Sequence, residues 1–163
     1  MGTSSSTEHT CRSIMTLQPV ALQRADPVTK AVKLLLDNRM LGIPVIEPDS
    51  RYVGMFLKST LIALLLPRVV SHQELTPEIG HLIDLGFVTE TLDDARERFA
   101  RVANDPVERH MKTDTPILRP DTPVTSALFL LHRTRNFLPV VEESTEKLVG
   151  VVSTWDILAK VSQ

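Results

Sequence analysis

The sequence predicts an α/β protein of the α+β type, with two pseudo-twofold related units and a helical insertion between them. Three observations predict this fold: an internal repeat, a helical apolar pattern at the same place in each copy, and a pair of β-rich runs after it. The 163 residues, of which 42% are apolar, suffice for two small lobes with a buried core.

The repeat has a nearly constant offset. Pro27-Val28-Thr29 matches Pro123-Val124-Thr125, which sets the offset at 123 − 27 = 96 residues. Over a short stretch the second copy has one residue fewer. Beyond it the offset is again 96, so that Val53-Gly54 matches Val149-Gly150. Two long windows that match in one order indicate a duplicated unit of about 50 residues.

Each copy predicts the order strand, helix, strand, strand, helix. A short extended stretch leads to a helix start at Asp26-Pro27 and at Thr122-Pro123, where we expect an N-cap residue followed by proline at the first helical position. Apolar residues at three- and four-residue spacing then predict a helix. Polar turn residues separate the two β-rich runs, and a second helix closes each copy from Ser59 and from Thr154. The predicted strands are residues 20–22, 43–46 and 52–57, then 117–118, 138–141 and 148–152. The two copies are expected to bury their apolar sheet faces against one another.

The remaining segments are a tail and an insertion. Residues 1–12 are polar and are interpreted as a flexible tail, although Met1-Gly2 also fits a loose myristoylation pattern. The insertion, residues 67–107, contains a capping box at Thr91 and a predicted helix from Leu92 to Asn104. Residues 71–88 suggest one or two helices. The two copies accordingly span residues 13–66 and 108–163.

Composition excludes several classes of protein. A formal net charge of −2 and a pI near 6.2 argue against general attraction to nucleic acid. The longest apolar run is far shorter than the roughly 20 residues that span a bilayer, so we expect no membrane insertion and a cytoplasmic protein. Cys11 is the single cysteine of the sequence, which excludes an intramolecular disulfide. It is interpreted as a tail residue without a nucleophilic role.

No pattern typical of catalysis or metal binding is present. The sequence contains no GxSxG, P-loop or HExxH motif, so we predict that the protein is not an enzyme and requires no cofactor. His81 and Asp84 are three residues apart, and an exposed polar pair explains them better than a metal site.

The ordered motifs of both copies resemble the CBS domain, the module named after cystathionine β-synthase. In the first copy they are Asp26-Pro27-Val28-Thr29, Gly42-Ile43-Pro44-Val45 and Val53-Gly54. The second copy is more similar to the family, with Leu138-Pro139-Val140-Val141 and Gly150-Val151-Val152-Ser153-Thr154-Trp155-Asp156. The chain therefore looks like a tandem CBS pair, or Bateman module.

The resemblance implies binding rather than catalysis. Such pairs bind an adenosine ligand (AMP, ADP, ATP or S-adenosylmethionine) in a cleft between the two motifs. They pass its occupancy to an attached or separate partner, and many form homodimers. We therefore expect a nucleotide-binding regulatory module that acts on an unknown protein in trans. The insertion is a candidate surface for that contact.

The resemblance also indicates where the ligand binds. Ser153 and Thr154 lie where a strand meets a helix N-terminus, which suits a phosphate, and Asp156 can accept both hydroxyls of a ribose. The resemblance places the adenine among apolar residues of the first copy, and glycine there permits close approach of a ring. The expected ligand-binding residues are Thr16, Val20, Gly42, Ile43, Pro44, Ser153, Thr154 and Asp156.

Two alternatives remain open. Ser153 and Asp156 also fit plain helix capping, with Ser153 as N-cap and the acid three residues on. In the first copy, Leu57 and Thr60 stand where the second copy has the hydroxyl residue Ser153 and the carboxylate of Asp156. This difference predicts at most one good adenosine site per chain. A purely structural or oligomerisation module without a physiological small ligand is the second hypothesis.

Overall fold

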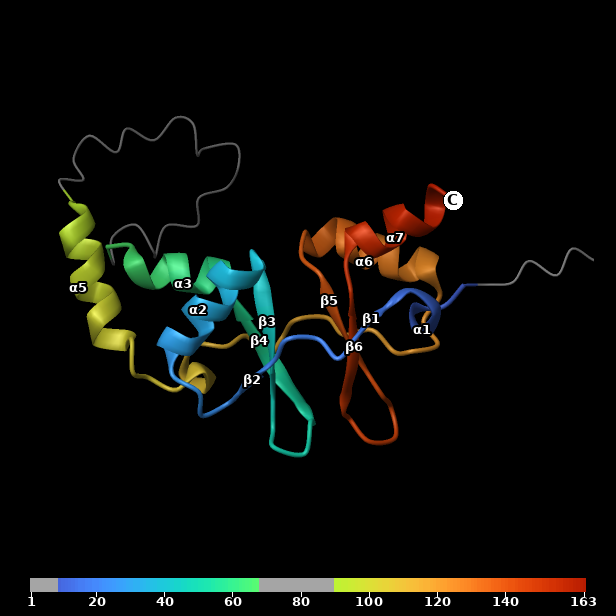
Figure 1. Ribbon diagram of the computed structural model, residues 1–163, viewed down its shortest axis with the longest axis horizontal. Coiled ribbons are helices and arrows are strands. Elements are labelled where there is room, and N and C mark those ends of the chain that lie inside the picture. Colours follow the sequence, from blue (N-terminus) through green and yellow to red (C-terminus); the bar gives the residue numbers. More distant parts are fainter. Residues whose placement is uncertain (1–8, 68–89) are drawn as a thin grey trace, which may run out of the picture.

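The computed structural model describes residues 9–67 and 90–163, and its two units lie side by side along the long axis (Figure 1). The first unit contains β2 (Leu22–Gln23), α2 (Val28–Asn38), β3 (Gly42–Ile46), β4 (Tyr52–Leu57) and α3 (Lys58–Leu65). The second contains α6 (Val124–Thr134), β5 (Leu138–Val141), β6 (Leu148–Val152) and α7 (Thr154–Val161). Before the first unit lie α1 (Cys11–Ile14) and β1 (Thr16–Leu17), and between the units lie α5 (Leu92–Val102) and a 3-10 turn, η1 (Val107–Arg109). The predicted fold class is confirmed, and so is the order of elements except at residues 117–118, where the predicted strand is reduced to a single bridge between Leu118 and Val140.

Each unit has a three-stranded sheet, and the units exchange strands. One sheet has the order β2-β3-β4, and the other has the order β1-β6-β5. Strand β1 comes from the start of the chain but pairs antiparallel with β6, with Thr16 opposite Val151. In the mirrored place, Lys112 forms a bridge with Met55 of β4. The segment that leads into the first unit is therefore part of the second unit's sheet, and the segment that leads into the second unit touches β4 through a single bridge. The sequence analysis predicted neither pairing.

Backbone hydrogen bonds confirm the repeat. The amide of Val28 donates to the carbonyl of Asp105 at 2.9 Å, and 96 residues later the amide of Val124 donates to the carbonyl of His9 at 2.9 Å. These remote carbonyls satisfy the first amide of α2 and of α6, which a helix leaves without an internal partner.

The predicted N-caps are wrong by one residue. The N-caps are Pro27 and Pro123, and neither makes a side-chain cap. The Asp26 carboxylate instead accepts a hydrogen bond from the amide of Gln23 at 2.8 Å. Because backbone carbonyls already occupy the amides at the helix starts, no side-chain cap is needed there.

Two glycines make the strand exchange possible. A Cβ built on Gly150 would lie 2.9 Å from the carbonyl oxygen of Thr16, and one on Gly54 would lie 2.7 Å from that of Lys112. Neither glycine has a positive φ. Their role is therefore space for the crossing segment rather than conformational freedom.

The main hydrophobic clusters lie within the units. In the first unit, buried Ala31 and Leu35 of α2 pack with Ile43, Val45 and Phe56 of the sheet. The second unit repeats this arrangement with α6, α7 and its own sheet. Each unit's own helices cover one face of its sheet, while sheet residues outside these clusters, such as Met55 and Val141, are buried as well. The expectation that the units bury apolar sheet faces against each other stays a prediction.

Cys11 is completely buried in α1 and packs in the core of the second unit, so its interpretation as a tail residue is wrong. Burial raises the pKa of the Cys11 thiol to about 11. The thiolate is the reactive form, and little of it exists near neutral pH.

We expect folded protein at pH 8 to resist iodoacetamide for hours, whereas protein in 6 M guanidinium is alkylated within minutes. Mass spectrometry of intact protein measures this. Rapid alkylation of the folded chain would show that α1 is not packed against the second unit.

The insertion contains the predicted helix. Helix α5 begins after Thr91, whose side chain forms a capping box with Asp94 as expected. The interpretations of residues 71–88, of His81 with Asp84, and of Met1-Gly2 fall outside the described residues. Of the helices in residues 9–67 and 90–163, not one has the length and apolar character needed to traverse a lipid bilayer.

Candidate functional site

The candidate site is centred on the N-terminus of α7. Oδ2 of Asp156 accepts hydrogen bonds from the amide of Ser153 at 2.6 Å and from its hydroxyl at 2.7 Å. The hydroxyl of Ser153 in turn accepts from the amide of Asp156 at 3.3 Å. The capping alternative is thus present in the structure, and it occupies one oxygen of the carboxylate.

The second carboxylate oxygen faces the start of the chain. The Thr16 hydroxyl donates to Oδ1 of Asp156 at 3.4 Å, a long contact between residues 140 positions apart in the sequence. Strand β1 places Thr16 there because it pairs with β6, directly before α7. Three of the expected site residues, Thr16, Ser153 and Asp156, therefore lie together. Thr154 is exposed at the first position of α7.

Asp156 opens onto a hollow of about 270 Å³ between α1 and α7. Lys160 lies one helical turn after Asp156, on the same face of α7. The hollow therefore combines a carboxylate and an ammonium group. The sequence analysis missed Lys160, although its spacing of four residues from Asp156 was a usable signal. The hollow is lined by Ser13, Ile14, Asp156, Ala159, Lys160 and Gln163.

The remaining expected residues lie in the first unit and do not line this hollow. Ile43 is completely buried in the core, where Val20 packs against the same cluster. Pro44 is also buried. A Cβ on Gly42 would lie 2.8 Å from Cδ2 of Leu57, so the space beside this glycine is filled by a neighbouring side chain. The structure thus brings the acidic half of the expected site together and holds the apolar half within the first unit.

The first unit lacks the same polar arrangement at its equivalent position. Leu57 is the N-cap of α3 and makes no side-chain cap. Thr60, which occupies the position of Asp156 in the repeat, has a buried hydroxyl oxygen without a hydrogen-bond partner. Lys112 stands in the place of Thr16. No carboxylate is available at these positions to accept a ribose, as the sequence analysis predicts.

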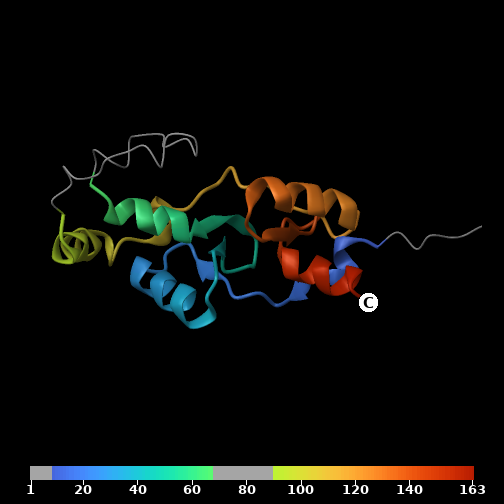
Figure 2. The same cartoon turned by 90° about the horizontal axis from the view of Figure 1, so that it is seen from above.

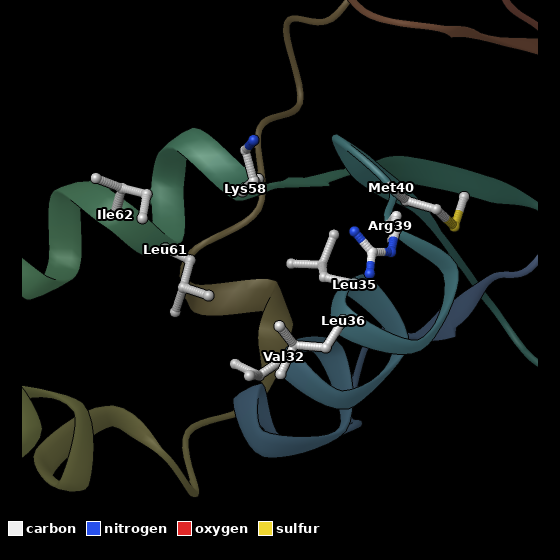
Figure 3. Close-up of a pocket in the computed structure, with 8 residues that line it drawn as sticks. All are labelled: Val32, Leu35, Leu36, Arg39, Met40, Lys58, Leu61 and Ile62. Carbon is white, nitrogen blue, oxygen red and sulfur yellow. The ribbon is translucent and has the colours of Figure 1, made fainter.

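A second hollow, of about 510 Å³, lies between α2 and α3 of the first unit (Figure 3). Val32 and Leu36 on α2 face Leu61 and Ile62 on α3, and Lys58 stands at the start of α3. Its lining is mainly apolar and contains none of the expected site residues; its charged groups are the cations Arg39 and Lys58, and it has no carboxylate to accept ribose hydroxyls.

Within residues 9–67 and 90–163, His, Cys, Asp and Glu side chains form no group of three that would hold a metal ion. The polar groups gathered at α7 are a carboxylate, a hydroxyl pair and an ammonium group, a set that suits hydrogen bonding to an organic ligand. The fold and site together define a duplicated binding module with one polar site at an exchanged strand.

Comparison with known proteins identifies that module. The family model of the CBS domain matches residues 11–67 and 107–163. The chain therefore belongs to the CBS domain family, and it contains the domain twice. The expected resemblance is confirmed.

Similar proteins share this architecture. The chain is 36% identical over 58 residues to a CBS domain-containing protein of Dictyostelium discoideum. The matched stretch covers 36% of this chain and 40% of that protein. The chain thus spans less than half of this relative's length. The crystal structure of the CBS-pair protein CBSX2 from Arabidopsis thaliana matches with a TM-score of 0.73 and 20% identity, over 95% of each chain.

Two similar structures contain adenosine compounds. CBSX2 has also been solved in complex with AMP, and that structure matches with a TM-score of 0.67 and 21% identity, over 95% of this chain and 97% of that one. The CBS domain pair of MJ0100, solved with 5′-methylthioadenosine and S-adenosyl-L-methionine, matches with a TM-score of 0.61 and 14% identity, over 94% of this chain and 96% of that one. At these identities the likeness establishes the fold of this chain.

Proposed function

We propose that this CBS pair is a regulatory module that senses an adenine nucleotide and signals its occupancy to a partner protein. The ligand is AMP, ADP, ATP or S-adenosylmethionine, bound beside Asp156 where the two motifs exchange strands. The observation that carries the proposal is the meeting of Thr16, from the start of the first motif, with Asp156 of the second motif. The adenosine compounds bound by CBSX2 and MJ0100 support this choice of ligand class.

The hydrogen bonds that the Asp156 carboxylate already accepts leave one of its oxygens for recognition of a ribose. An ionised carboxylate has about four acceptor positions, two on each oxygen. Ser153 fills both positions on Oδ2, which holds the side chain in one orientation. Among the described residues, Oδ1 accepts only the long contact from Thr16, so it can accept one ribose hydroxyl at its second position and the other in place of Thr16.

The other polar groups fit the rest of a nucleotide. Because Asp156 occupies the amide and hydroxyl of Ser153, and its own amide is bonded to Ser153, a phosphate is left with the amides of Thr154 and Trp155, the Thr154 hydroxyl and the ammonium group of Lys160. We place the adenine toward the first motif, near Val20 and the strand that contains Gly42, Ile43 and Pro44. Because Ile43 is buried, this strand would contact the adenine through its backbone.

The signal would travel by a shift in population. A ligand that contacts β1 and α7 at once favours the arrangement in which the strand exchange is complete. Exposed apolar side chains on the helices of both motifs, such as Leu36 (72% exposed), Phe129 (62%) and Trp155 (79%), fit a homodimer. The module itself carries out no reaction, and the regulated protein acts in trans.

A second candidate function is a structural or oligomerisation module without a physiological ligand. The completed capping box favours it, because Ser153 and Asp156 stabilise α7 without any ligand. Under this alternative the same polar residues are present only to begin a helix.

A thermal-shift screen distinguishes the two functions. A ligand that binds only folded protein raises the melting temperature in proportion to the logarithm of its concentration. We expect at least one of AMP, ADP, ATP and S-adenosylmethionine to do so, with guanosine monophosphate as the matched control. The absence of any shift at millimolar concentrations would favour the structural module.

A further inference from the structure

Helix α5 covers the outer end of the first unit (Figure 1). Phe99 of α5 packs against the core of that unit, and α5 lines an apolar hollow of about 220 Å³ together with Val32 of α2 and Leu65 of α3. Arg98 adds a polar contact, because its guanidinium donates to the carbonyl of Leu65 at 2.9 Å. The first unit therefore uses a docked amphipathic helix to shield its end.

In the part of the chain that the structure describes, no helix covers the equivalent surface of the second unit. The offset of 96 places Leu128 at the position of Val32 and Val161 at that of Leu65. Val32 and Leu65 are half-buried, whereas Leu128 is 45% exposed and Val161 is 76% exposed. A hollow of about 400 Å³ opens there, between the start of α6 and the end of α7. This α6–α7 groove is lined by His9, Pro123, Val124, Thr125, Lys160 and Val161.

The start of α6 and the end of α7, which line the groove, lie beside α1 at the end of the molecule opposite α5 (Figures 1 and 2). The chain's own sequence does not repeat α5 there. The offset places Thr3 at the position of Phe99 (99 − 96 = 3) and Ser6 at that of Val102 (102 − 96 = 6). The segment that precedes α1 therefore does not repeat the apolar stripe of α5.

We propose that the α6–α7 groove docks an amphipathic helix of a partner protein, in the way that α5 docks on the first unit. Charge specifies this helix further. In the repeat, Lys160 matches Leu64 of the first unit. Leu64 directly precedes Leu65, whose carbonyl accepts a hydrogen bond from Arg98. An arginine at that point would face an ammonium group, so the partner helix has an acidic residue where α5 has Arg98.

This inference assigns a surface to the partner named in the proposed function, but the docking does not depend on a nucleotide. Lys160 also lines the hollow beside Asp156. A partner carboxylate and a ligand phosphate would thus share one ammonium group, which connects the groove with the nucleotide site.

The test uses the full chain without nucleotide and two labelled peptides. The first peptide has the sequence of residues 90–104, and the second carries Arg98→Glu. We expect saturable binding of one peptide per chain by fluorescence anisotropy, with a Kd on the order of 100 µM because a short isolated helix must be ordered. The Arg98→Glu peptide should bind about two- to five-fold tighter, and Lys160→Glu in the protein should reverse this preference.

Two protein variants locate the binding. Val161→Asp should weaken both peptides at least about ten-fold, whereas Leu36→Asp, an equally exposed change on α2, should leave them unaffected. A peptide with Leu92→Asp and Phe99→Asp should not bind. The proposal is overturned if neither peptide binds at 1 mM, or if Val161→Asp leaves binding unchanged. It is also overturned if Val161→Asp alters the oligomeric state in sedimentation, because the groove would then be an interface between copies.

Discussion

Asp156→Ala is expected to lower the affinity for AMP at least about 100-fold. The substitution removes the only carboxylate oxygen that the site offers to a ribose, and hydrogen bonds to a charged group contribute about 1.5–3 kcal/mol each. Two such bonds more than account for a 100-fold loss. Isothermal titration calorimetry of the variant against wild type measures the effect.

The same substitution removes the Asp156 half of the capping box of α7, although the N-cap Ser153 remains, so a control is needed. Loss of capping interactions costs up to about 1 kcal/mol of stability. The capping box of Thr91 and Asp94 on α5 has the same geometry away from the site, and hydrogen bonds from Thr91 hold the pKa of the Asp94 carboxyl below its usual value. Asp94→Ala should therefore lower stability by a similar amount and leave AMP binding intact. If Asp156→Ala binds AMP as wild type does, the carboxylate has only a capping role.

Gly150→Ala is expected to destabilise the fold by about 1–3 kcal/mol and to weaken AMP binding as well. The added methyl would lie 2.9 Å from both the carbonyl oxygen of Thr16 and the sulfur of Met15. Overpacking of this kind costs about 1–3 kcal/mol, because neighbouring groups must move. Since Thr16 is the backbone partner of β6, relief of the clash moves it away from Asp156.

Gly54→Ala is the matched control for this second prediction. Its methyl would lie 2.7 Å from the carbonyl oxygen of Lys112, so urea denaturation should show a comparable loss of stability. The affinity for AMP should stay near wild type, because Gly54 lies in the first unit and the carboxylate of Asp156 lies in the second. Equal loss of AMP affinity in both variants would contradict a site located at β1 and α7.

The duplicated fold was predictable because local sequence patterns define most of its helices and strands. Strands β4, β5 and β6 have the predicted bounds, since runs of β-branched and aromatic residues between turn residues define them. The offset of 96 recurs in the hydrogen bonds that begin α2 and α6, although the sequence could not show that the carbonyls of Asp105 and His9 supply them. Such bonds join backbone groups of any residue type, and they leave no signature in the sequence.

The candidate site was predictable only in part. Ser153 and Asp156 stand in a recognisable motif, and their capping geometry follows from their spacing of three residues. The exchange of β1 brings Thr16 to them, and a two-residue strand has no periodicity from which to predict its partner. The role of Gly42 was missed for a similar reason, because contact with Leu57 depends on the register of β3 and β4.

The number of AMP molecules bound by one chain tests the central claim most directly. The second motif offers Asp156 and Ser153 at the exchanged strand, while the first motif offers Thr60 and Leu57 in their places. Calorimetric titration of the full chain, with protein concentration fixed by amino-acid analysis, should give one AMP per chain. Two equivalent AMP molecules per chain would contradict the account, because the site would then not require the carboxylate.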